Sequence, residues 1–146
     1  MVKKIILHNK YTVELANDNP NCIFIFGDNL MKKGTGGQAC IRYCKNSFGV
    51  PTKKYPSCHE NAYFTDNEYD CNCDIIINTI NKLREELNKY DFMIFPLDGL
   101  GTGLAKLNEC APSTFNFLKK TMNTLFDDIE RENIGQESKI KGQILW

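Results

Sequence analysis

Two unbroken apolar runs, each followed by a glycine-rich turn, constrain the fold of this chain most strongly. The runs are Cys22–Phe26, CIFIF, and Phe92–Leu97, FMIFPL. Continuous apolar stretches of this length are typical of strands covered on both faces of a sheet. Asp74–Tyr90 has apolar side chains at helical spacing between them, and a second such stripe follows Pro112 and Ser113. This alternation of strands and helices predicts an α/β domain with a largely parallel or mixed sheet.

The other expected elements are more weakly patterned. We expect a helix over residues 39–44, ended by Gly49 and Pro51, because small and apolar side chains share one helical face there. Further strands are expected at Lys4–Leu7, Tyr11–Leu15, Ala62–Thr65 and in the tail, residues 139–146.

Length and charge limit the functions to consider. The 146 residues suit a single domain, 1–146, and the 18 basic and 18 acidic residues balance. This balance disfavours a strongly basic nucleic-acid-binding protein and a cationic membrane-surface protein. No apolar run is long enough to cross a bilayer, and the first residues do not resemble a signal peptide. We therefore expect a cytoplasmic protein with no membrane partner.

The seven cysteines predict neither a disulfide framework nor a clear metal site. Their number is odd, and Cys71 and Cys73 form a C-x-C pair without the second pair that structural zinc sites use. Cys58 lies beside His59, but nothing in the sequence orients that imidazole. We expect reduced thiols, no metal and no cofactor, although zinc binding at Cys71 and Cys73 stays open.

Each apolar run leads into a loop with almost no large side chains. The two loops read GDNLMKKGTGGQA and PLDGLGTGLAKL. Glycine lets the backbone approach a ligand closely, and successive N–H groups in such turns form anion-binding concavities. Because both loops follow central strands, we expect them at one sheet edge, where they would suit a pyrophosphate. Neither loop matches the dinucleotide or P-loop pattern, and plain tight turns are the alternative.

The residues expected to bind the ligand come from both loops and from the end of the predicted strand at 62–65. They are Gly27, Asn29, Gly34, Thr35, Gly36, Gly37, Gln38, Thr65, Asp66, Gly99, Leu100, Gly101, Thr102, Gly103 and Leu104.

The segment GTGGQACI, residues 34–41, resembles the glycine-rich loop and following helix of macro domains. PLDGLGTGLAKL is similar to their second phosphate loop. The likeness is greatest to the branch with the terminal ADP-ribose protein glycohydrolases and the ADP-ribose 1″-phosphatases, and it spans Cys22 to about Phe126. It implies a three-layer α/β/α macro-like domain with a mixed central sheet and a cleft for ADP-ribose. The implied partners are ADP-ribose or a related nucleotide and ADP-ribosylated protein.

Several positions depart from that family. Gln38 stands where one group of macro hydrolases has an acidic residue, and Ala105 and Lys106 stand where the glycohydrolase branch has its aspartate. The lysine partner of that aspartate is also absent near Thr65. The glycohydrolase pair is thus not reproduced in this chain.

Asp28 and Asp98 are the candidate catalytic residues, because each carboxylate lies beside a glycine loop and could activate water or hold a ribose hydroxyl. Each could instead cap its own turn. Lys53 and Lys54 could reach a phosphate, and Phe64 or Tyr63 could stack on a base, although solvated lysines and core aromatics are commoner.

Three functions follow from these residues. The first is a macro-like domain that binds ADP-ribose or a related nucleotide and hydrolyses at the ribose 1″ position, as an ADP-ribosyl hydrolase or 1″-phosphatase. The second is a non-catalytic reader or sequestering protein for such a nucleotide, which Ala105 favours. The third, a nucleic-acid or protein-interaction module, would leave the glycine loops unexplained.

Overall fold

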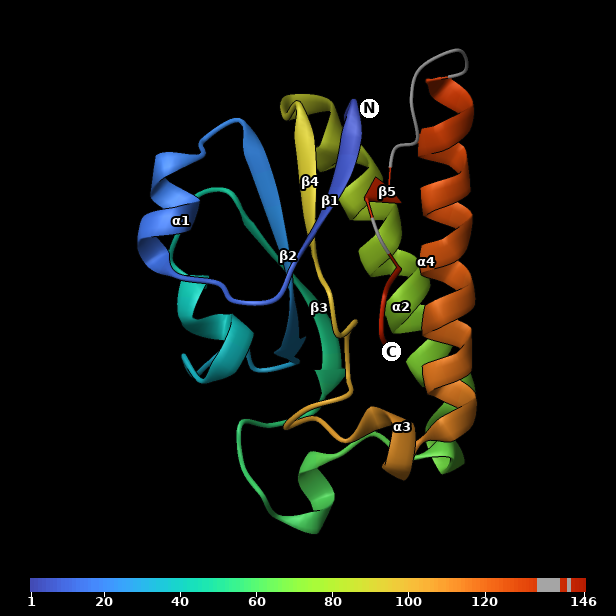
Figure 1. Cartoon of the computed structure of the whole chain (residues 1–146). Coiled ribbons are helices and arrows are strands. Elements are labelled where there is room, and N and C mark those ends of the chain that lie inside the picture. The colour runs from blue at the N-terminus through green and yellow to red at the C-terminus, as the bar shows by residue number, and fades with distance from the viewer. Residues whose placement is uncertain (134–139, 142) are drawn as a thin grey trace.

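A five-stranded parallel sheet forms the centre of the computed structural model (Figure 1). The structure describes residues 1–133, 140–141 and 143–146. The strands, in the spatial order β3-β2-β4-β1-β5, are β1 (Lys4–His8), β2 (Cys22–Asn29), β3 (Ser47–Lys53), β4 (Phe92–Pro96) and β5 (Ile140–Lys141). The expected tail strand lies partly outside the described residues, and within them β5 pairs with β1.

The α/β class expected from the sequence is confirmed, but a mixed sheet is not what the structure contains. All pairings between the described strands are parallel. Parallel neighbours need crossover connections, and the segments between successive strands provide them. The α-helices are α1 (Val13–Asp18), α2 (Tyr69–Glu86), α3 (Leu107–Cys110) and α4 (Pro112–Glu132), and the 3-10 helices are η1 (Gly37–Ile41), η2 (Glu60–Ala62), η3 (Asp66–Glu68) and η4 (Leu87–Lys89).

Helices cover both faces of the sheet. Figure 1 shows α2 and α4 on one side and α1 on the other, and η1 packs on the α1 side. The central strand β2 divides its side chains between the two cores, because successive residues of a strand point to opposite faces. Ile23 and Ile25 join the core under α2 and α4, whereas Phe24 and Phe26 join the core under α1 and η1.

The expected strand at Tyr11–Leu15 is wrong, because a helix begins there. The Thr12 hydroxyl accepts a hydrogen bond from the backbone N–H of Leu15 at 3.0 Å and so caps the start of α1. Tyr11 turns inward, and its hydroxyl donates to the buried carbonyl oxygen of Ile25 at 2.8 Å.

The expected helix over residues 39–44 is also wrong in its extent. A single short 3-10 helix, η1, ends at Ile41, and turns over residues 42–46 lead into β3. Gly49 and Pro51 do not end a helix but lie within β3. Proline is tolerated there because β3 is an edge strand, where a missing N–H costs no ladder hydrogen bond.

The expected strand at Ala62–Thr65 is absent from the described structure. The segment contains the end of η2 and one isolated antiparallel bridge between Lys53 and Tyr63. The helix expected at Asp74–Tyr90 instead begins at Tyr69, and its acidic first turn suits a helix N-terminus.

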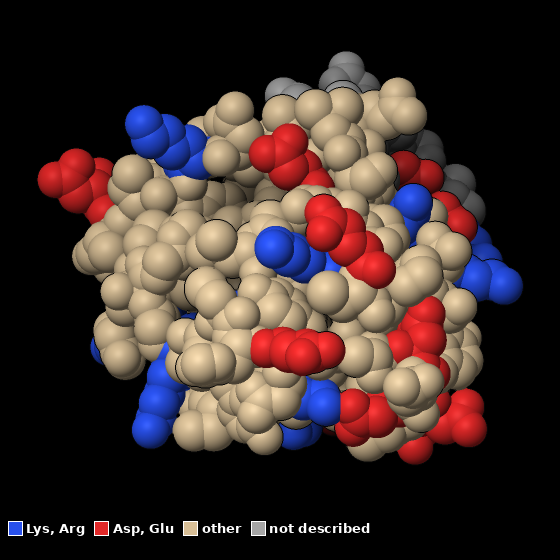
Figure 2. Space-filling view, turned by 90° about the horizontal axis from the view of Figure 1, so that it is seen from below, with Lys and Arg blue, Asp and Glu red and all other residues tan. Residues whose placement is uncertain are grey.

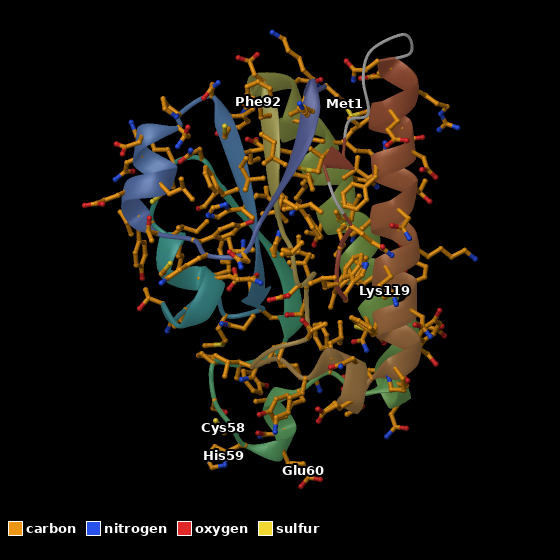
Figure 3. All side chains as sticks on the ribbon, viewed as in Figure 1. Met1, Cys58, His59, Glu60, Phe92 and Lys119 are labelled. Carbon is orange, nitrogen blue, oxygen red and sulfur yellow. The ribbon has the colours of Figure 1, made fainter. Side chains whose placement is uncertain are left out.

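The two apolar runs do become neighbouring parallel strands, β2 and β4. Their glycine loops therefore emerge at one edge of the sheet. In Figure 3 this edge lies toward Cys58, His59 and Glu60, at the opposite end of the molecule from Phe92 at the start of β4. Across the described segments, the helices are all too short or too polar to cross a membrane.

Candidate functional site

A cleft at the carboxyl edge of the sheet joins the two glycine loops. Its larger part, which we call the lysine compartment, measures about 600 Å³ and is lined by the end of β2, the first loop, residues 52–63 and residues 103–106. Its smaller part, the glycine compartment, measures about 210 Å³ and lies between residues 36–38 and 101–105. Gly27, Gly36 and Gly103 line both parts. Pockets of several hundred Å³ are typical of small-molecule sites.

Backbone, and not charged side chains, forms most of the glycine compartment. Its lining contains five glycines, and Gln38, Thr52, Thr102, Leu104 and Ala105 complete it. In the part of the chain that the structure describes, the N–H groups of Gly101, Thr102 and Gly103 donate to no protein acceptor. Successive N–H groups without an acceptor are the donors that an anion-binding loop requires.

The second loop needs glycine at two positions. Gly99 and Gly101 have φ angles of +78° and +82°, which favour glycine. A Cβ on Gly101 would lie 2.7 Å from the Cβ of Leu107. Leu100, between them, is fully buried in the core under α2 and α4 and so anchors the loop. Leu100 was expected to contact the ligand, but its buried side chain does not support that expectation.

Gln38 braces the two loops against each other. Its Oε1 accepts a hydrogen bond from the N–H of Gly27 at 2.9 Å, and its Nε2 donates to the carbonyl oxygen of Gly99 at 3.4 Å. Thr52 supports the same strand end, because its hydroxyl donates to the carbonyl oxygen of Asp28. Gln38 thus has a structural role at the junction of the two loops.

Asp28 is held in a nearly buried ion pair. Arg42 Nη2 lies 2.6 Å from Asp28 Oδ1 and Nη1 lies 2.9 Å from Oδ2, and the two side chains are only 7% and 8% exposed. Oδ1 also accepts from the N–H of Asn29 at 2.7 Å. A bidentate pair of this kind gives fixed geometry as well as charge balance. Both carboxylate oxygens of Asp28 are therefore engaged by protein donors.

The same arginine and Asn29 fix the first loop. Arg42 donates to the carbonyl oxygens of Lys33 and Gly34, at 3.1 and 2.8 Å. Asn29 Nδ2 donates to the Lys33 carbonyl oxygen at 2.7 Å. Gly34 has a φ of +94°, which explains why glycine stands at this turn. Thr35 follows within the same loop. Arg42, Lys33 and Thr52 were not predicted as site residues. Arg42 and Thr52 contact Asp28 from fourteen and twenty-four positions away, so the local sequence does not show these contacts.

Three lysines and a tyrosine distinguish the lysine compartment. Lys33, Lys53 and Lys106 line it, and the Nζ atoms of Lys53 and Lys106 lie 4.9 and 5.9 Å from the ring centre of Tyr63. Lys54, the other lysine named from the sequence, lies outside the lining and forms an ion pair with Glu68. Figure 2 views this end of the molecule and shows basic and acidic side chains scattered over a mostly uncharged surface.

Asp98 lies beside the cleft and not in it. It is exposed and lines a separate hollow of about 320 Å³ together with His8 and Lys10. Gly37 and Gln38 stand between this hollow and the glycine compartment, because they line both. The structure therefore does not bring Asp98 and Asp28 into one compartment.

Thr65 and Asp66 support a helix instead of lining the cleft. The carboxylate of Asp66 accepts from the N–H groups of Ser113 and Thr114, at 2.9 and 3.0 Å, and so caps the N-terminus of α4. Burial acts to raise the pKa of Asp66, but these hydrogen bonds and one from the Thr114 hydroxyl lower it overall. The Thr65 carbonyl oxygen accepts from Asn72.

The cysteines do not converge. Cys71 is exposed and Cys73 is buried, although both lie on α2, and burial raises the pKa of the Cys73 thiol. No group of three or more metal-ligating side chains occurs among the residues that the structure describes. His59 is exposed at the end of the loop that follows β3 (Figure 3).

Comparisons with known proteins identify a family without a known activity. No curated protein and no solved structure matches the chain. One family model matches residues 6–121, which include the end of β1, all of β2 to β4, both glycine loops and the lining of the cleft. The chain therefore belongs to the family of unknown function DUF7831.

Proposed function

We propose that the cleft binds ADP-ribose or a related nucleotide and that the domain is macro-like, as its glycine-loop motifs suggest. One observation carries the proposal. Two glycine loops from adjacent parallel strands meet at a compartment whose described lining has no charged side chain and offers backbone N–H groups that pair with no described acceptor. Such donors suit a pyrophosphate, whose oxygens accept several N–H hydrogen bonds at once.

The geometry favours binding without hydrolysis. Asp28 is the one carboxylate in the described lining of the two compartments, and Arg42 engages both of its oxygens. A general base must reach the attacking water with a free lone pair in the right direction, and Asp98 lies in the neighbouring hollow. We therefore favour a reader or sequestering protein over an ADP-ribosyl hydrolase or 1″-phosphatase.

Substitution of Gly103 tests the binding site most sharply. A Cβ at Gly103 would meet no atom within 4 Å, whereas one at Gly101 would strike Leu107, so of these two loop glycines Gly103 is the one that accepts a side chain without strain. Gly103 lines both compartments, so Gly103→Glu adds a carboxylate where they meet. We expect it to weaken ADP-ribose binding by about 100-fold or more in calorimetry, because juxtaposed like charges cost several kcal/mol.

The matched control is Asn108→Glu, which adds the same charge on α3 at an exposed position outside the cleft lining. Both variants should unfold at nearly the wild-type temperature. Unchanged affinity in Gly103→Glu, or equal loss in both variants, would contradict the placement of the ligand.

A turnover assay separates the reader from the enzyme. The protein is incubated with excess ADP-ribose 1″-phosphate or with an ADP-ribosylated protein, and released phosphate or ADP-ribose is measured. We expect binding without product. Product that disappears in Asp98→Asn would instead establish the hydrolase.

A further inference from the structure

The lysine compartment carries a charge that the pyrophosphate alone does not require. Lys33, Arg42, Lys53 and Lys106 contribute four positive charges to its lining and Asp28 one negative charge, which leaves an excess of three positive charges. The whole chain, in contrast, has no net charge. The lining of this compartment is therefore more positive than the chain as a whole.

The excess is not neutralised by neighbouring side chains. Arg42 and Asp28 satisfy each other, so the three lysines account for the excess. Among the described residues, Lys33, Lys53 and Lys106 have no carboxylate within ion-pair distance. Like charges gathered at a cleft repel one another, and a bound anion removes that repulsion.

Two of these positive charges lie near the ring of Tyr63. Both Lys53 and Lys106 approach its ring, at 4.9 and 5.9 Å from the centre. An aromatic face attracts ammonium groups weakly and so gathers them without neutralising them. Lys53 comes from the end of β3 and Lys106 from the segment after the second loop, so the ring links the two walls of the compartment.

The backbone of Lys106 adds a further observation. Its φ of +47° lies in the left-handed region, where glycine or asparagine is less strained. A lysine at such a position costs conformational energy that asparagine would largely avoid. The charge of Lys106 offers a reason for its presence, because its side chain reaches the lysine compartment.

We propose that the lysine compartment binds a phosphate monoester that the ligand carries in addition to its pyrophosphate. The inference rests on the proposed function, since it places this group in the same cleft. Lysine ammonium groups are compact charges that bind phosphate without a fixed orientation, and three of them match a dianionic monoester. The ligand class is therefore a dinucleotide-like pyrophosphate with a phosphorylated ribose.

Two probes distinguish which ribose carries the phosphate. ADP-ribose 1″-phosphate has it on the distal ribose, and ADP-ribose 2′-phosphate has it on the adenosine ribose. Their affinities are compared with that of ADP-ribose by calorimetry at constant ionic strength. We expect one of them to bind roughly tenfold tighter than ADP-ribose, as charge-assisted hydrogen bonds allow.

The test variant is Lys53→Gln combined with Lys106→Asn. Asparagine tolerates the left-handed backbone, so the loop keeps its conformation while the charge is lost. The matched control is Lys54→Gln, which removes a neighbouring lysine already paired with Glu68. We expect the double variant to bind the phosphorylated ligand and ADP-ribose with about equal affinity, and the control to keep the preference for the phosphorylated ligand.

The outcomes separate this inference from the proposed function. If ADP-ribose binds but neither phosphorylated form binds more tightly, or if the double variant keeps the preference, the monoester subsite is refuted and the nucleotide site stands. If no nucleotide binds, the proposed function fails. Inorganic phosphate then tests the monoester subsite alone. Broadening of the phosphorus resonance of phosphate by wild type but not by the double variant would support the subsite, and any other result would refute it.

Discussion

Removal of Arg42 tests whether Asp28 anchors the first loop. Arg42→Met keeps a long apolar side chain but deletes the guanidinium that binds both oxygens of Asp28. The Asp28 carboxylate then remains in a site where it is only 7% exposed. The carbonyl oxygens of Lys33 and Gly34 lose the same donor. We therefore expect both lower stability and a looser loop.

The magnitude follows from the burial of the pair. Breaking a buried ion pair by removing one partner costs about 3–5 kcal/mol, because the other charge stays buried without compensation. The pair lies at the wall of a cleft, which water can enter, so the lower end of about 3 kcal/mol applies. For a chain of this size that corresponds to a fall in the unfolding temperature of roughly 6–12 °C.

A double-mutant cycle measures the interaction. Urea unfolding of wild type, Arg42→Met, Asp28→Ala and the double variant gives the coupling free energy. The double variant should be more stable than Arg42→Met alone, because it no longer buries an unpaired carboxylate. ADP-ribose affinity should fall in Arg42→Met, since Lys33 and Gly34 line the cleft.

Two results would refute this reasoning. A loss below about 1 kcal/mol in Arg42→Met would show that the pair behaves as an exposed one. Additive losses in the double variant would show that the two side chains do not depend on each other.

Two further predictions concern close packing and a distant cap. Gly49→Ala should lower the free energy of unfolding in urea by about 1–3 kcal/mol, because its Cβ would lie 2.6 Å from Asp28 Oδ2. Gly103→Ala, whose Cβ meets no atom within 4 Å, should change it by less than about 0.5 kcal/mol. Asp66→Ala should cost about 1 kcal/mol at neutral pH, because it uncaps α4. The pKa of Asp66 is lowered in the folded state, so its contribution to the free energy of unfolding is complete above the ordinary value of 3.8 and is lost as the pH falls through the lowered pKa. If the difference in stability between Asp66→Ala and wild type stayed constant in acid, the capping role would be contradicted.

The sequence predicted the helices and strands whose apolar side chains form the cores of the domain. β2, β4 and most of α2 and α4 were expected from continuous apolar runs or helical spacing, and the structure confirms them. Their side chains form the two cores, so a local pattern and the tertiary environment agree there.

Predictions failed where distant side chains decide the local conformation. Asp66 seemed to end a strand at the ligand edge, but it caps α4 through N–H groups more than forty residues away. Pro51 seemed to end a helix, but it fits β3 because that strand lies at the sheet edge. Local periodicity shows neither the helix that Asp66 caps nor the edge position of β3.

The candidate site was predictable in its backbone and not in its charges. Glycines mark backbone conformations directly, so both loops could be placed at one edge of the sheet. The engagement of Asp28 by Arg42 across fourteen positions, and the meeting of Lys53 and Lys106 at Tyr63, depend on the folded chain. The exposed position of Asp98 likewise could not be derived from its neighbours in the sequence.

The chain contains one tryptophan, Trp146, and its indole packs against the second glycine loop. A Cβ on Gly99 would lie 2.5 Å from Trp146 Cβ, and the indole meets the rings of Phe95 and Phe115 edge-on. Its intrinsic fluorescence is therefore a built-in optical reporter of that loop. A titration followed at the tryptophan emission can measure nucleotide binding without a label, and quenching experiments can compare the order of the loop with and without ligand.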